Sequence, residues 1–118
     1  MGYAQQAALL ASALALCGCI PTKLGTLEQR SPTIQVQSAH SVAELSGCIS
    51  DKLKSFRGSV NYVPRPDGAT VTYEMAGVPF MSVSITDQGT TRQVTTFGPY
   101  SLNKKVNRHR LDAVRTCI

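Results

Sequence analysis

The sequence predicts a small α+β domain, in which an antiparallel meander of three to four strands is flanked by an N-terminal and a C-terminal helix. Three observations predict this fold class. An apolar stripe at helical spacing starts at Ser41, alternating apolar and polar residues fill much of the range 59–97, and a second helical stripe follows Gly98-Pro99. Because a meander must bury one face, we expect both helices to cover the same side of the sheet.

The first helix is predicted to begin at Ser41. Ser41 and Glu44 have the Ser-x-x-Glu spacing, in which the hydroxyl and the carboxylate each satisfy an exposed backbone donor. The predicted end is Arg57-Gly58, with Gly58 as a left-handed cap. The apolar stripe between these ends consists of Val42, Leu45, Cys48, Ile49, Leu53 and Phe56, and the polar side carries Asp51, Lys52 and Lys54.

The strands are predicted from a change to a period of two. Residues 70–75 alternate between apolar and polar side chains, which is typical of a half-buried strand. Residues 59–63 form a second candidate strand, and the Pro-Asp-Gly sequence that ends at Gly68 predicts a turn between the two. Further strands are expected at 80–86 and 90–97, and a short first strand is expected at 33–37.

The second helix is predicted to follow Gly98-Pro99, with Ser101 as its cap and Leu102 as its first residue. Its packed side is expected to carry Val106, Ala113, Val114 and Cys117. Cys48 and Cys117 would then lie on the packed stripes of two neighbouring helices, where their side chains can meet.

The N-terminal segment has the composition of an export signal. An apolar run from Ala7 to Leu16 ends in Leu16-Cys17-Gly18-Cys19, and every Lys, Arg, Asp and Glu of the chain lies beyond Cys19. A membrane-spanning helix needs about 20 apolar residues, whereas the hydrophobic region of a signal needs only about 7 to 15. The length of the run therefore predicts a signal.

This segment resembles the N-termini of bacterial lipoprotein precursors, whose lipobox reads Leu, a small residue, Gly or Ala, and the acceptor Cys. Leu16, Cys17, Gly18 and Cys19 stand in those places. The resemblance implies a signal peptide at 1–18, an acylated Cys19 with a flexible tether over 19–32, and one periplasmic domain at 33–118. Ile20, in place of Asp, implies the outer membrane. The alternatives are a secreted protein without lipid, or a buried N-terminal helix with two core cysteines.

Removal of a signal would leave Cys48 and Cys117 as the two thiols of the exported domain. In an oxidising compartment, such a pair predicts a disulfide. The chain-entropy model assigns about 4 kcal/mol to a bridge that closes a loop of about 70 residues. The alternative is metal ligation together with His40 and His109, but the sequence has no short ligand spacing. We therefore expect no metal and no cofactor.

The sequence contains few elements of a catalytic centre. It has no Gly-x-Ser-x-Gly segment, its seven acidic residues are scattered, and its turn glycines are isolated. A non-catalytic protein is therefore expected, and an enzyme is the least favoured class.

The net charge is +5 and the sequence pI is about 9.3. The densest basic run consists of Lys104, Lys105, Arg108, Arg110 and Arg115. These residues could form an exposed face for lipopolysaccharide, anionic lipid headgroups or an acidic partner. Alternatively, they are ordinary solvated cations toward a helix C-terminus. Nucleic acid is not expected as a partner of an exported domain.

Two functions remain. The first is a lipid-anchored accessory subunit of a cell-envelope assembly, of the secretion, pilus or outer-membrane biogenesis type, with an envelope protein as its partner. The second is a binding module for an anionic envelope component such as lipopolysaccharide, or a periplasmic inhibitor.

Overall fold

The structure is a computed structural model that describes residues 23–118, with side-chain surroundings from Thr26 onward. The predicted signal peptide, its lipobox and the acceptor Cys19 lie outside the described residues. Within the described part of the chain, no helix is both long enough and apolar enough to cross a membrane.

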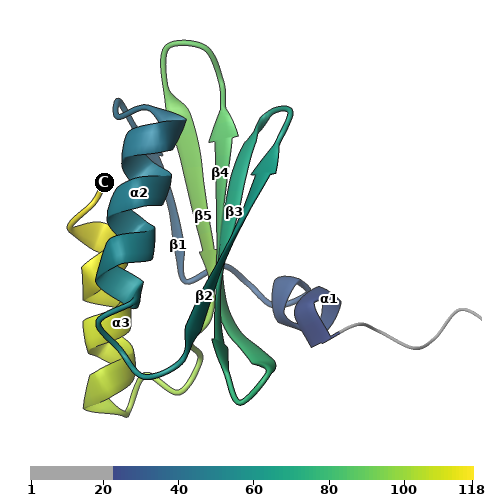
Figure 1. The fold of residues 1–118 in the computed structure, drawn as a ribbon, viewed down its shortest axis with the longest axis vertical. Coiled ribbons are helices and arrows are strands. Elements are labelled where there is room, and N and C mark those ends of the chain that lie inside the picture. The colour runs from purple at the N-terminus through teal and green to yellow at the C-terminus, as the bar shows by residue number, and fades with distance from the viewer. Residues whose placement is uncertain (1–22) are drawn as a thin grey trace, which may run out of the picture.

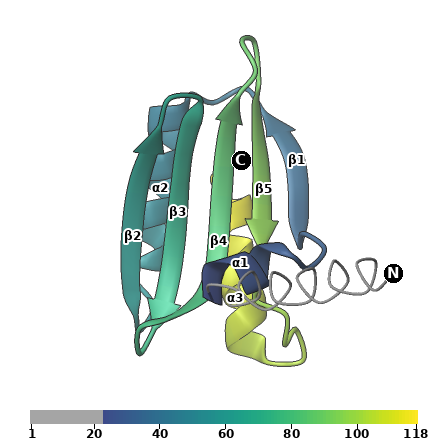
Figure 2. The same ribbon diagram turned by 90° about the vertical axis from the view of Figure 1, so that its right-hand side faces the viewer.

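A five-stranded antiparallel sheet forms the centre of the domain, with strand order β1-β5-β4-β3-β2 (Figure 2). The predicted meander is confirmed as four consecutive strands. They are β2 (Ser59–Arg65), β3 (Gly68–Met75), β4 (Val78–Asp87) and β5 (Arg92–Phe97).

The short first strand expected at 33–37 is confirmed as β1 (Ile34–Ser38). Because β1 joins the sheet beside β5, the expected sheet of three to four strands is too small. Its register pairs Ile34 with Thr96 and Ser38 with Arg92. The two strands are separated by more than fifty residues of chain, and this long-range pairing places β1 at the edge of the sheet.

Two helices cover one face of the sheet, as expected (Figure 1). They are α2 (Val42–Leu53) and α3 (Lys105–Arg115). Leu45, Ile49 and Leu53 of α2 are fully buried, as are Val83 and Ile85 of β4. The main core therefore lies between the sheet and this helical layer.

The predicted N-terminal cap of α2 is confirmed. The Ser41 hydroxyl accepts a hydrogen bond from the backbone N–H of Glu44 at 3.1 Å and donates one to its carboxylate at 3.1 Å. The predicted cap at Gly58 is wrong, because the helix ends earlier, at Leu53. Gly58 has a positive φ of 133°, and a Cβ there would lie 2.8 Å from the Tyr73 ring, so this glycine permits a close approach of two chain segments.

The predicted start of α3 is wrong, because the helix begins at Lys105 and Lys104 is its N-cap residue without a side-chain cap. The predicted packed side of α3 is also wrong at Val106, which faces solvent. Val106 is 44% exposed, whereas Asn107, Arg110 and Leu111 are buried together with Val114 and Cys117. With 3.6 residues per turn, the phase set by Val114 and Cys117 turns residues 107, 110 and 111 inward.

Cys48 and Cys117 form a disulfide, which joins α2 to α3 with a Cα–Cα distance of 5.8 Å. This confirms the predicted pair. The bridge closes a long loop, with a sequence separation of 69, that contains the whole meander.

A third helix, α1 (Lys23–Glu28), lies on the opposite face of the sheet, at one end of it (Figures 1 and 2). Its Leu27 is buried, and the helix packs against β4. Residues 23–28 were expected to belong to the flexible tether. The packed part of the chain therefore begins before the expected boundary at residue 33.

Candidate functional site

One end of the domain brings together four segments that are distant in the sequence. They are α1, the β3–β4 turn at 75–78, the connection at 98–104 and the first turn of α3, and we call this region the hairpin end. Gly98 makes the close packing possible. Its φ is +71°, and a Cβ there would lie 2.5 Å from the Phe80 carbonyl oxygen and 3.2 Å from Leu27.

A β-bulge places Phe80 at the centre of the hairpin end. The β3–β4 register passes from Tyr73 opposite Met81 to Glu74 opposite Pro79, which leaves Phe80 without a partner. Pro79 has no backbone N–H and cannot complete the ladder there. Bulges redirect side chains, and the Phe80 ring packs edge-on against Tyr73 with a centroid distance of 6.3 Å.

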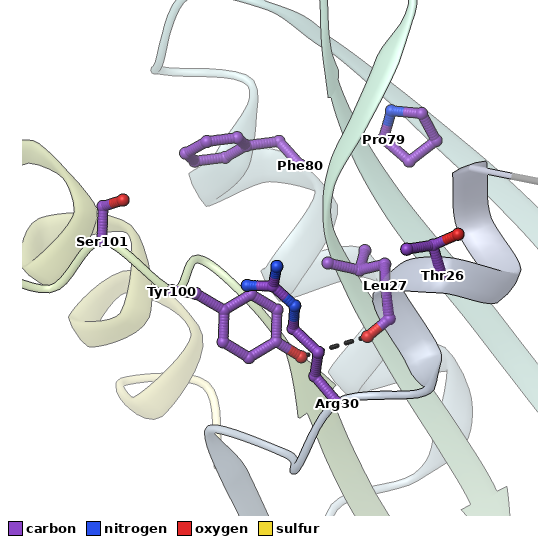
Figure 3. Close-up of a pocket in the computed structure, with 7 residues that line it drawn as sticks. All are labelled: Thr26, Leu27, Arg30, Pro79, Phe80, Tyr100 and Ser101. Carbon is purple, nitrogen blue, oxygen red and sulfur yellow. Dashed lines mark hydrogen bonds between the residues drawn. The ribbon is translucent and has the colours of Figure 1, made fainter.

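The first of two cavities at this end, which we call the outer cavity, has a volume of about 270 Å³. Figure 3 shows its lining: Thr26, Leu27, Arg30, Pro79, Phe80, Tyr100 and Ser101. The Tyr100 hydroxyl donates a hydrogen bond to the Leu27 carbonyl oxygen at 3.1 Å, and the Arg30 guanidinium lies 4.8 Å from the Tyr100 ring centroid. These contacts attach α1 to the connection that leads into α3.

The second cavity, which we call the arginine pocket, has a volume of about 200 Å³. It is lined by Met75, Phe80, Ser101, Lys104, Val106, Asn107 and Arg110. Phe80 and Ser101 line both cavities, so the two lie next to each other.

Arg110 is the chemically unusual residue of the arginine pocket, because its side chain is only 5% exposed. Its guanidinium carbon lies 5.1 Å from the ring centroid of Phe80, 5.2 Å from that of Tyr73 and 5.5 Å from that of Phe56. Cation–π contacts of this kind offset part of the cost of burying the charge.

The hydrogen bonding of Arg110 is incomplete. Nη1 donates to the Asn107 side-chain oxygen at 2.7 Å, and the fully buried Asn107 donates to the Ser101 carbonyl oxygen at 2.8 Å. Within the described residues, Arg110 Nε has no hydrogen-bond partner and the guanidinium forms no salt bridge with a carboxylate. The pocket therefore contains a buried cation without a counter-charge from the described part of the chain.

Exposed apolar side chains lie beside the arginine pocket. The described residues expose seven large hydrophobic side chains, and four of them, 37–44% exposed, lie at the hairpin end. These four, which we call the apolar rim, are Met75, Val78, Leu102 and Val106. Met75 and Val106 line the pocket, and Val78 pairs with Met75.

One of the five residues of the predicted basic face is not exposed. Lys104, Lys105, Arg108 and Arg115 are exposed, but Arg110 is buried on the packed side of α3. Arg108 donates to the Leu102 carbonyl oxygen at 2.7 Å, and Arg115 lies 3.3 Å from the Asp112 carboxylate. Three of the exposed cations line a shallow cavity of about 350 Å³, which also contains an acidic residue; its lining includes Lys105, Arg108, Arg115, His109 and Asp112.

The two histidines lie apart from the disulfide. His40 Nδ1 lies 3.3 Å from the Glu44 carboxylate, beside the cap of α2. Hydrogen bonds hold the pKa of Glu44 below its ordinary value of 4.5. The largest effect comes from the Ser41 side chain, and the next largest comes from His40. Cys48 and Cys117 are consumed by the disulfide, and residues 26–118 contain no group of three or more His, Cys, Asp or Glu side chains suited to a metal ion.

Sequence reasoning missed the pocket because it placed Arg110 among the exposed cations. The available signal was helical phase, since Arg110 precedes Val114 by four residues and Cys117 by seven and therefore shares their side of the helix. The aromatic neighbours could not be found in this way, because Phe56 and Phe80 belong to other elements and Phe80 is placed by a bulge.

No protein-family model, curated protein or solved structure matches this chain.

Proposed function

We propose that the protein is an exported, lipid-anchored and non-catalytic accessory subunit of a bacterial cell-envelope assembly, which contacts its partner through the hairpin end. The observation that supports this proposal most strongly is the apolar rim, which lies beside the arginine pocket. Exposed apolar patches next to pockets are typical of protein contact sites.

The charge around the apolar rim indicates the kind of partner. Lys104, Lys105 and Arg108 are exposed beside Leu102 and Val106, and Arg30 lines the outer cavity together with Phe80. A partner surface with an apolar centre and acidic residues around it would complement this arrangement.

The disulfide and the position of α1 support the exported, anchored part of the proposal. A disulfide between Cys48 and Cys117 suits an oxidising compartment. Lys23, the first residue of α1, follows the proposed acylated Cys19 by four residues. At about 3.5 Å per residue, that segment spans at most about 14 Å. An anchor at Cys19 would hold the hairpin end near the membrane surface, so the proposed partner is a protein at or in that membrane.

Site-specific photo-crosslinking in the envelope of the bacterium tests the proposed contact. A photo-reactive amino acid at Val106 should give a discrete crosslinked species with one envelope protein. The matched control is Thr90, which is exposed in the β4–β5 turn at the opposite end of the sheet. Crosslinking from Thr90 alone, or equal crosslinking at both positions, would contradict the proposed surface.

The proposed anchor has its own test. Mass spectrometry of the membrane-extracted protein should find a mature N-terminus at Cys19 that carries acyl chains, and Cys19→Ala should release the protein from membranes. An intact Met1 terminus on the exported protein would overturn the lipoprotein proposal.

A second candidate function is binding of an anionic envelope component such as lipopolysaccharide. It is favoured by the shallow cavity in which Lys105, Arg108 and Arg115 gather on α3. The Asp112 carboxylate in the same cavity reduces its positive charge, which places this function second.

A further inference from the structure

We infer that the arginine pocket is a recognition site for a carboxylate group, with Arg110 as the residue that binds it. The inference does not depend on the proposed function. The carboxylate can come from a small free carboxylic acid or from an acidic residue of a partner protein, and the chemistry of the pocket is the same for both.

The first argument is the unpaired charge. An arginine side chain keeps its positive charge throughout the physiological pH range. Burial of such a charge is costly unless it is paired and hydrogen-bonded. Arg110 is 5% exposed, and no carboxylate among residues 26–118 pairs with it. A bound anion would remove this imbalance.

The second argument is the number of free donors. A guanidinium has five N–H donors, and aromatic rings contribute attraction but no acceptor oxygen. The described residues provide one acceptor, the Asn107 side-chain oxygen, and Nε is buried without a partner. The Tyr73 hydroxyl, whose ring adjoins the guanidinium, is also buried without a described hydrogen-bond partner. A buried donor without a partner calls for an explanation, and a bound ion is one that the apolar walls of this pocket allow for Arg110 Nε.

The third argument is the orientation of Arg110. Asn107 holds Nη1 and is itself held by the Ser101 carbonyl oxygen, while Phe56, Tyr73 and Phe80 surround the guanidinium. A side chain restrained in this way loses little further freedom when it binds a ligand, which favours affinity.

The size and lining of the pocket favour a carboxylate over a phosphate. Its volume of about 200 Å³ suits a small group, and Met75, Phe80 and Val106 give it apolar walls. One buried cation balances one negative charge, and the planar fork of arginine matches the two oxygens of a carboxylate. Lys104 is exposed at the mouth of the pocket, where it can attract an anion without entering the site.

NMR titration of the ¹⁵N-labelled mature domain, with its disulfide intact, tests the inference. The probes are sodium propionate, glutamate with both termini capped, and sodium chloride and sodium phosphate at matched ionic strength. The Nε–H resonance of Arg110 should shift in a saturable manner with propionate or with capped glutamate. Saturation by propionate alone would indicate a small free acid, and saturation by capped glutamate would indicate an acidic side chain of a partner.

Two variants connect the titration to the pocket. Arg110→Lys, which also assigns the resonance, should abolish saturable binding as reported by the backbone amides of residues 104–107. Asn107→Asp places a carboxylate on the guanidinium from within the chain, although it removes the amide donor to the Ser101 carbonyl oxygen. The backbone NMR spectrum reports whether this variant keeps the fold, and the folded variant should not bind either carboxylate, whether or not Arg110→Lys folds. Lys52→Arg, on the exposed side of α2, should bind as the wild type does.

The carboxylate site would be disproved by any of three results. These are the absence of saturation with both carboxylates, equal shifts with chloride or phosphate, and unchanged binding by Asn107→Asp. Because the purified domain is used, failure here leaves the proposed contact in the envelope standing. Failure of the crosslinking experiment leaves the pocket standing in the same way.

Discussion

The side-chain oxygen of Asn107 accepts a 2.7 Å hydrogen bond from Arg110 Nη1, one turn further along α3, and both side chains are buried. This pair occupies positions that a small helix packed on a sheet would ordinarily give to apolar residues. Through this pair, α3 places the positive charge of Arg110 at the hairpin end.

Asn107→Leu is expected to destabilise the domain by about 1.5–3 kcal/mol, because it removes the only described acceptor of a buried charged donor. Urea unfolding measures the loss. Asn103→Leu, at an exposed position before the helix, is the matched control and should change stability little. Equal stability of the two variants would show that the Asn107–Arg110 hydrogen bond contributes nothing.

Loss of the disulfide should cost about 4 kcal/mol, since the bridge restrains a loop of 69 residues in the unfolded chain. The double variant Cys48→Ser/Cys117→Ser should therefore unfold at a much lower urea concentration. Addition of a reductant should lower the stability of the wild type to that of the variant and should leave the variant unchanged. A wild type that is insensitive to reductant would refute this prediction.

Two glycines should respond to alanine in opposite directions. Gly98→Ala should destabilise the domain by more than about 1 kcal/mol, because its φ is +71° and a Cβ would lie 2.5 Å from the Phe80 carbonyl oxygen. Gly47→Ala, within α2, should stabilise it by about 0.5–1 kcal/mol, because the new Cβ would meet no atom within 4 Å apart from its chain neighbours and the backbone of its own helix. Thermal unfolding of both variants checks the signs, and a stabilised Gly98→Ala would contradict the packing described here.

The capping interaction of α2 should depend on pH in one direction. The folded state holds the pKa of Glu44 below its ordinary value of 4.5, chiefly through the Ser41 hydrogen bond and next through that of His40. The ionised carboxylate therefore stabilises the fold fully above pH 4.5, and this contribution is lost as the pH falls through the lowered pKa.

Glu44→Gln should accordingly be less stable than the wild type near neutral pH and should approach it as the pH falls below 4.5. Urea unfolding across this range measures the difference. The same substitution in a Ser41→Ala background should show a weaker pH dependence, because the principal hydrogen bond to the carboxylate is then absent. A stability difference between Glu44→Gln and the wild type that grows as the pH falls would contradict this prediction.

The exposed cations distinguish the two candidate functions. Replacement of Lys104, Lys105 and Arg108 with Ser should weaken binding to lipopolysaccharide-containing vesicles, in a salt-sensitive manner, if an anionic envelope component is the ligand. Lys52→Ser/Lys54→Ser, on the exposed side of α2, is the control for charge alone. Salt-insensitive binding, or an equal effect of the control, would exclude this second function.

Much of the fold could be predicted because its signals are local. The cap formed by Ser41 and Glu44, the apolar stripe of α2 and the alternation in residues 70–75 each arise within a few turns or one strand. Cys48 and Cys117 could be paired because each lies on a helical stripe that must face the same sheet. The fifth strand of the sheet and the packing of α1 were missed because β1 pairs with β5 and α1 packs against β4, which are distant in the sequence. The predicted start of α3 was wrong because Lys104, and not Ser101, is the N-cap residue.

The sequence by itself determined the α+β class, the helix–meander–helix order and the disulfide pair, because periodicity and capping are properties of short stretches of chain. Only the tertiary structure decided that Arg110 is buried among Phe56, Tyr73 and Phe80 and not exposed with Lys104 and Lys105. The physical reason is that a charge is identified by its residue type, but its environment depends on the phase of the helix and on side chains supplied by other elements.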